Sequence, residues 1–177
     1  GGATGSSLMS DTWIFGPVIQ QQSSPEDWMN PAPTAPPSAR RRAAMAYAPN
    51  SDLTYLFGGE VDSTPLDGLW TYSVNSNQWI QKTPSPAPTA RAQSAMAFDS
   101  FNNKLVMFSG YLSGGAFTTA TWVYDPAAGP QGSWTNYNPA TKPTARVGSA
   151  MVYDTDSHLL YLFGGYDYTG VHKSDTW

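Results

Sequence analysis

Side chains that commonly perform catalysis or bind metals are scarce in this sequence. It contains two histidines, His158 and His172, and no cysteine, which excludes disulfides, thiolate metal sites and cysteine nucleophiles. The two histidines share no spacing typical of a metal site, so each is expected to be an exposed polar residue. Asp154 and Asp156 form an Asp-x-Asp pair of the kind found in calcium loops, but at a hairpin such a pair indicates a turn. No catalytic, cofactor-binding or metal-binding residue is therefore predicted.

Four aromatic residues are better candidates for binding chemistry: Tyr111, Phe117, Tyr166 and Tyr168. They lie in segments 111–120 and 166–173, which differ in length and composition although the chain around them is similar. Variable loops on a rigid scaffold commonly carry recognition. Aromatic rings at these positions can stack on a sugar or anchor a protein partner. The alternative is that they pack over a neighbouring element and serve the fold alone.

The charge pattern disfavours a nucleic-acid partner. The net charge is −4, and the nine basic residues form one cluster, Arg40-Arg41-Arg42, rather than a broad basic face. Arg41 and Arg42 are expected to be a solvated pair at a loop end. No apolar run approaches the length of a membrane-spanning helix. The low charge and the abundance of Ser, Thr and Pro favour an extracellular or cell-surface protein.

A repeated pattern of arginine, glycine and tryptophan runs through the chain. Arg40, Arg91 and Arg146 lie 51 and then 55 residues apart, and each opens a similar segment. The tryptophans at positions 28, 79 and 134 keep the same two spacings. Between them lie an apolar segment that ends in a pair of small residues and an earlier tryptophan. Several landmarks at one period indicate a repeat protein.

Each repeat predicts four short strands joined by tight turns, because no segment has the i, i+3, i+4 apolar spacing of an amphipathic helix. The glycine pairs are expected to adopt positive φ, and the tryptophans to fill the space between sheets. The arginines are expected to tie one sheet to the next through loop carbonyls. We expect an all-β fold with strands near residues 43–48, 53–58, 69–74, 93–98, 104–109, 148–153 and 159–164.

These marks resemble the kelch repeat, in which a glycine pair ends the second strand, an aromatic residue lies in the third, a tryptophan follows and an arginine opens the next unit. Gly58-Gly59 and Gly164-Gly165 match that pattern, whereas Ser109 replaces the first glycine of its pair. The resemblance implies blades of four antiparallel strands, packed around a channel as in a β-propeller. It implies no known kelch enzyme. The oxidases resembling galactose oxidase need a cysteine, and the iron-dependent specifier proteins need an aspartate where this chain has Thr64.

The resemblance covers the chain as a single kelch propeller segment. It divides into a partial blade over residues 1–30, blades over 40–80 and 91–137, and a partial blade over 146–177. Known propellers hold about four to eight blades, so we expect an incomplete ring, completed by further blades of the same longer chain or by other copies. Because open sheet edges pair with other chains, the isolated segment is expected to oligomerise or aggregate.

The leading functional hypothesis is a non-catalytic protein-interaction or assembly module. The alternative is the scaffold or carbohydrate-binding domain of a larger, possibly secreted, enzyme. The expected partner is accordingly a protein or a carbohydrate, with no nucleic acid, no cofactor and no membrane span.

Overall fold

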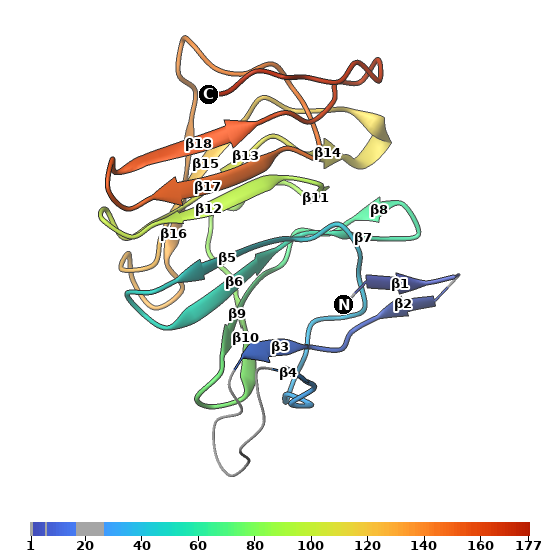
Figure 1. Ribbon diagram of the computed structural model, residues 1–177, viewed down its shortest axis with the longest axis vertical. Helices are drawn as coiled ribbons and strands as arrows, with labels where there is room; N and C mark the ends of the chain where they lie inside the picture. The colour runs from blue at the N-terminus through green and yellow to red at the C-terminus, as the bar shows by residue number, and fades with distance from the viewer. Residues whose placement is uncertain (1, 6, 17–26) are drawn as a thin grey trace.

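The computed structural model describes residues 2–5, 7–16 and 27–177, and these form antiparallel β-sheets almost throughout (Figure 1). Two sheets have four strands each. The first runs in the order β5 (Ala44–Ala48), β6 (Leu53–Phe57), β9 (Leu69–Ser73) and β10 (Gln78–Lys82). The second runs in the order β12 (Ala95–Asp99), β13 (Lys104–Phe108), β15 (Thr121–Asp125) and β16 (Ser133–Tyr137). In both sheets the order in space follows the order along the chain: the first two strands are joined by a tight hairpin, and the two middle strands by the longer segments 58–68 and 109–120.

Smaller sheets flank these two. β17 (Ala150–Asp154) pairs with β18 (Leu159–Phe163), and β3 (Ile14–Gly16) pairs with β4 (Asp27–Met29). These two pairs lie at opposite ends of the row of sheets in Figure 1. Short hairpins and ladders complete the set: β1 (Gly2–Thr4) with β2 (Ser7–Met9), β7 (Glu60–Val61) with β8 (Thr64–Pro65), and β11 (Arg91–Ala92) with β14 (Tyr111–Leu112).

The predicted all-β class and the four-strand antiparallel order are confirmed. Every range in which a strand was expected contains one, displaced by at most two residues, for example β12 at 95–99 against an expected 93–98. In the described part of the chain the helical content is one 3-10 turn, Ser113–Gly115. Closure of the ring and the limits of the blades stay predictions.

Large side chains fill the space between the two four-stranded sheets. Tyr55 stacks on Phe98 with ring centroids 6.1 Å apart and planes 8° apart. Phe57 meets Trp134 edge to face at 5.7 Å, and Trp134 is only 2% exposed. The equivalent Trp79 packs on the opposite side of the first sheet, against Ile14 of β3. Each such buried side chain contributes about 1.5–3 kcal/mol. Trp79 and Trp134 therefore fill the space between sheets as expected, whereas Trp13 and Trp28 are 52% and 61% exposed.

The arginine that opens each repeat is buried, but its side chain binds within its own repeat. The Nη1 atoms of Arg40, Arg91 and Arg146 donate to the carbonyl 18 residues ahead, at distances of 2.9, 3.2 and 3.2 Å. The expectation that these side chains tie one sheet to the next was therefore wrong. The backbone makes that link instead: the carbonyl of Arg91 accepts from Gly59 of the preceding repeat at 3.0 Å. A buried guanidinium is costly to charge, and burial lowers the pKa of Arg91 to about 10.

Candidate functional site

The inner ends of three repeats are joined by backbone hydrogen bonds. Arg42, Gln93 and Gly148 each lie two residues after a repeat arginine, and all three adopt positive φ (59°, 58° and 67°). The N–H of Gln93 donates to the carbonyl of Arg42 (2.9 Å), and the N–H of Gly148 donates to the carbonyl of Gln93 (3.3 Å). Residues 51 and 55 positions apart in the sequence are thereby fixed side by side.

A second set of pairings brings one residue of each loop to the same place. The residue that follows each glycine-containing pair forms a bridge with the residue after the repeat arginine: Glu60 with Arg41, Tyr111 with Ala92, and Tyr166 with Val147. The bridges of Glu60 and Tyr166 carry reciprocal backbone hydrogen bonds of 2.9–3.2 Å and 3.0 Å. Because the pairing repeats with the sheets, Glu60, Tyr111 and Tyr166 occupy equivalent positions at the inner end.

These segments line a partly open cavity of about 190 Å³, named the inner cavity below. It is lined by side chains from three repeats: Arg42, Glu60, Ser63, Gln93, Tyr111, Phe117 and Tyr166. Three of the four aromatic residues expected to bind are thus brought together. Tyr168 is not among them, because it is 79% exposed at the tip of its loop.

The three rings form walls set at steep angles to one another. Tyr111 and Phe117 are perpendicular, with centroids 6.3 Å apart, and Phe117 and Tyr166 meet at 68° across 6.3 Å. The hydroxyl of Tyr166 donates to Oε1 of Gln93 across the repeat boundary (3.3 Å). Edge-to-face contacts of this kind stabilise aromatic pairs. The rings therefore pack against one another edge to face and do not form a flat platform.

Glu60 is the residue of the inner cavity that sequence reasoning missed. It is 0% exposed, and its Oε1 accepts hydrogen bonds from Nε of Arg41 (2.8 Å) and Nη1 of Arg42 (2.9 Å). Arg41 and Arg42 are thus partly solvated, as expected, but they also pair with a buried carboxylate, which needs such partners and which the sequence did not lead us to expect. The other oxygen, Oε2, has no hydrogen-bond partner among the described residues. The available signal was positional: Glu60 occupies the repeat position of Tyr111 and Tyr166.

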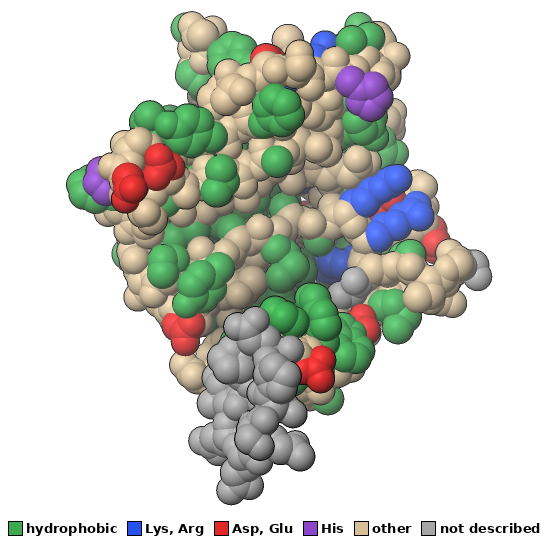
Figure 2. Space-filling view, viewed as in Figure 1, with side chains coloured by type: hydrophobic (Ala, Val, Ile, Leu, Met, Phe, Trp, Pro, Cys, Tyr) green, Lys and Arg blue, Asp and Glu red, His purple; other side chains and the backbone are tan. Residues whose placement is uncertain are grey.

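Two guanidinium groups on one carboxylate leave this end of the inner cavity with a formal charge of +1. The side chains of Arg41 and Arg42 are 39% and 49% exposed, whereas that of Glu60 is 1% exposed. Figure 2 shows basic side chains grouped around an acidic one over β7 and β8. The arrangement offers guanidinium donors at the surface and a carboxylate oxygen beneath them.

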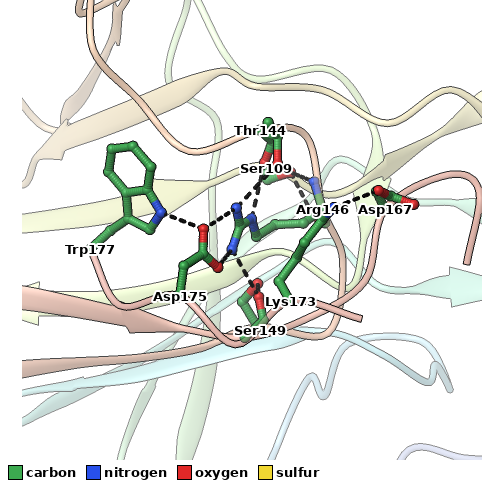
Figure 3. A network of polar contacts seen from close by, with 9 residues as sticks. Ser109, Thr144, Arg146, Ser149, Asp167, Lys173, Asp175 and Trp177 are labelled. Carbon is green, nitrogen blue, oxygen red and sulfur yellow. Dashed lines mark hydrogen bonds and ion pairs between the residues drawn. The ribbon is translucent and has the colours of Figure 1, made fainter. Parts of the chain in front are cut away.

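A separate polar network supports the last repeat (Figure 3). Asp175 receives Nη2 of Arg146 at 2.9 Å and the indole N–H of Trp177 at 2.7 Å, and the hydrogen bond from Arg146 lowers the pKa of this carboxyl. The hydroxyl of Ser109 accepts from the backbone N–H of Arg146 at 3.0 Å. Its oxygen also lies 2.5 Å from the Arg146 carbonyl and 2.6 Å from that of Thr118, although its single proton serves one acceptor at a time. Since Arg146 is 1% exposed, the network holds structure and offers little surface to a ligand.

The histidines do not contact Glu60 or its two arginines. His158 stacks on Phe101 with centroids 4.3 Å apart, and His172 contacts Tyr166 at 6.0 Å. Both are exposed. No group of three or more His, Cys, Asp or Glu side chains that could hold a metal ion occurs in residues 2–5, 7–16 and 27–177. Over the same ranges, no helix is long and apolar enough to cross a membrane.

Four-stranded antiparallel sheets set side by side, joined at their inner ends by a repeating backbone link, define a segment of β-propeller blades. Residues 1–177 match the family described as the KLHDC2/KLHL20/DRC7 Kelch-repeats domain, and the chain belongs to this kelch-repeat family.

The chain spans only a small part of the curated relatives that it matches. The chain is 32% identical over 133 residues to rat multiple epidermal growth factor-like domains protein 8, and 30% identical over 132 residues to the human protein of that name. Each match covers 72% of this chain but only 5% and 4% of the relative. Among solved structures, YjhT superposes with a TM-score of 0.64 at 17% identity, over 84% of this chain and 45% of that one. That likeness concerns the fold.

Proposed function

We propose that this kelch segment is a non-catalytic protein-interaction module that holds its partner over the inner cavity. The observation that carries the proposal is the convergence of Glu60, Tyr111 and Tyr166, from three repeats, on one cavity. Membership of the kelch-repeat family supports it, because protein interaction is typical of kelch domains. Aromatic and arginine side chains are also the types most enriched in binding hot spots.

The absence of catalysis is part of the proposal. A general acid or base needs a group free to exchange a proton with the substrate. The carboxylate of the inner cavity already accepts two charge-assisted hydrogen bonds, from Arg41 and Arg42, which engage its Oε1 within the protein.

A carbohydrate is the second candidate ligand. The inner cavity combines aromatic walls with carboxylate, guanidinium and carboxamide groups, which together can serve the hydroxyls and the apolar face of a sugar. In that case the segment would be the scaffold or carbohydrate-binding domain of a larger, possibly secreted, enzyme. The small share of its relatives that the chain covers is compatible with such a role.

The two candidates are separated by parallel screening of the 177-residue chain against a random peptide library and a glycan array. We expect selected peptides to bind the wild type and to lose at least tenfold in affinity for Phe117→Ala, since a hot-spot truncation costs about 2 kcal/mol or more. Tyr168→Ala is the matched control, because that ring lies outside the cavity. Glycan binding sensitive to Phe117→Ala, without peptide binding, would establish the carbohydrate reading instead. Peptides indifferent to Phe117→Ala would refute the proposed site.

A further inference from the structure

One residue that lines the inner cavity, Glu60, has a buried oxygen whose hydrogen-bonding requirement is not met by the described part of the chain. Among the described residues, Oε2 of Glu60 is buried without a hydrogen-bond partner, although Oε1 of the same carboxylate has two. Leaving a buried charged oxygen unpaired is costly, so unpaired groups of this kind call for an explanation. A ligand that donates a proton to Oε2 would remove that cost. The first property of the ligand is therefore an N–H or O–H donor.

The charges beside Glu60 restrict the donor further. A ligand ammonium group would approach two guanidiniums that already neutralise the carboxylate, and like charges at close range are unfavourable. A ligand carboxylate would suit Arg42 but would face the unpaired oxygen of Glu60 with no proton to donate. The group that satisfies both sides is uncharged and carries a donor next to an acceptor.

The shape of the cavity distinguishes between the uncharged groups. Sugars bind aromatic residues through a flat ring face, whereas Tyr111, Phe117 and Tyr166 stand at 90° and 68° to one another. Rings that meet edge to face in this way offer no flat platform for a sugar, and a carboxamide needs none. A primary carboxamide is planar, with two N–H donors on one side and a carbonyl acceptor on the other.

We propose that the inner cavity recognises a carboxamide side chain, that of an asparagine or glutamine in a protein partner. The amide N–H donates to Oε2 of Glu60, and the amide oxygen accepts from the guanidinium of Arg42. Because Oε2 is buried, the proposal requires a neighbouring side chain to move, and we assign that movement to Arg42, which lines the cavity and is half exposed. Glu60 is then the specificity-determining residue. This inference rests on the proposed function and names the chemistry of its partner.

Small probes test this selectivity on the wild-type chain. We would titrate the ¹⁵N-labelled protein with N-acetyl-glutamine methylamide and, in parallel, with the glutamate and lysine analogues and with methyl glucoside. We expect saturable shifts in the amide resonances of Gln93 and Tyr111 with the glutamine probe, and binding at least tenfold weaker for the other three. Equal or stronger binding of the glutamate, lysine or sugar probe would overturn the proposal.

Glu60→Gln should reverse the preference among the probes, a result that a misfolded variant would not give. This variant replaces the acceptor oxygen with an amide group able to donate, so the preference is expected to reverse in favour of the glutamate probe. Retention of the wild-type preference would show that Oε2 is not the recognition atom. Tyr168→Ala, outside the cavity, should leave all four affinities unchanged.

The peptide screen separates a failure of this inference from a failure of the proposed function. Peptides that bind through Phe117 but tolerate loss of every Asn and Gln would refute the carboxamide and leave the interaction module standing. A glutamine probe that binds a chain for which no peptide is selected would refute the module and retain the cavity chemistry.

Discussion

Gly165 tests how closely the loops are held against the inner ends of the repeats. It adopts a φ of +86°, and a Cβ added there would lie 2.7 Å from the carbonyl oxygen of Val147. Its neighbour Gly164 has a similar φ of +71°, but a Cβ there would lie 3.4 Å from the nearest atom, the Lys173 carbonyl oxygen. Replacing each glycine by alanine therefore imposes the same kind of backbone strain, and only Gly165→Ala adds a collision with backbone.

The two costs can be estimated separately. Alanine at a positive φ costs about 1 kcal/mol in both variants. Gly165→Ala must also displace the Val147 carbonyl by several tenths of an ångström, and overpacking of this kind costs about 1–3 kcal/mol. We therefore expect Gly165→Ala to be less stable than Gly164→Ala by about 2 kcal/mol, or about 4–8 °C in Tm for a chain of this size. Gly165→Val should be worse still, because a β-branched residue adds bulk and stiffness.

Urea unfolding followed by circular dichroism measures the difference, with the m-value as a check that both variants unfold from the same state. The Val147 carbonyl also accepts the N–H of Tyr166 at 3.0 Å, so displacing it moves one wall of the inner cavity. Gly165→Ala should for that reason weaken ligand binding as well. Equal stability of the two alanine variants would refute the close approach that we assign to Gly165.

Three further outcomes are expected. Ser109→Ala leaves the buried backbone N–H of Arg146 without its acceptor. The free energy of unfolding, measured by urea titration, should fall by about 1–3 kcal/mol. An unchanged free energy of unfolding would mean that water replaces the hydroxyl. In the folded chain the pKa of Asp175 lies below its ordinary value of 3.8, so the ionised carboxylate stabilises the fold at pH values above 3.8. This stabilisation is lost as the pH falls towards the lowered pKa. The difference in Tm between the wild type and Asp175→Asn should therefore be present at pH 6 and shrink below pH 3.8. Phe163 and Trp28 are 54% and 61% exposed, although the equivalent residues of the other repeats are buried. The isolated chain should therefore self-associate in sedimentation experiments, and Phe163→Asp should reduce the self-association. A wild-type chain that stays monomeric would contradict this prediction.

The strands could be predicted from the sequence because their signals are local and repeated. Each alternation of apolar residues ends at a turn or a glycine-containing pair, and these landmarks recur together. Ser109 shows how far this reasoning reaches. It interrupts the glycine pattern without altering the strand order, since its φ is +62° and its hydroxyl bonds to the Arg146 backbone.

The candidate site could be predicted only in part. Tyr111, Phe117 and Tyr166 were identified because loop aromatics are conspicuous. Tyr168 was indistinguishable from Tyr166 in the sequence, but the carboxylate of Asp167 accepts the N–H of Thr169 at 2.9 Å and fixes a turn that leaves Tyr168 in solvent. This turn determines that the Tyr168 side chain points into solvent, and the residue type alone does not reveal the turn.

Glu60 escaped sequence analysis for a different reason. Its burial depends on Arg41 and Arg42, which are 19 and 18 residues away along the chain and pair with it only once the loop bridges have formed. An isolated glutamate in a loop is ordinarily a solvated residue. Aligning the repeats by the position after each glycine-containing pair would have set Glu60 beside Tyr111 and Tyr166.

The backbone link through Arg42, Gln93 and Gly148 has a consequence for how recognition can diversify. It uses only main-chain atoms, so it tolerates a change of side chain at the bridge positions 60, 111 and 166. Each of those positions supplies one wall of the inner cavity, and each belongs to a different repeat. A substitution in one repeat therefore alters one wall and leaves the other two in place. Binding preferences in such a segment can vary combinatorially, with one independently exchangeable residue per repeat and an unchanged framework behind them.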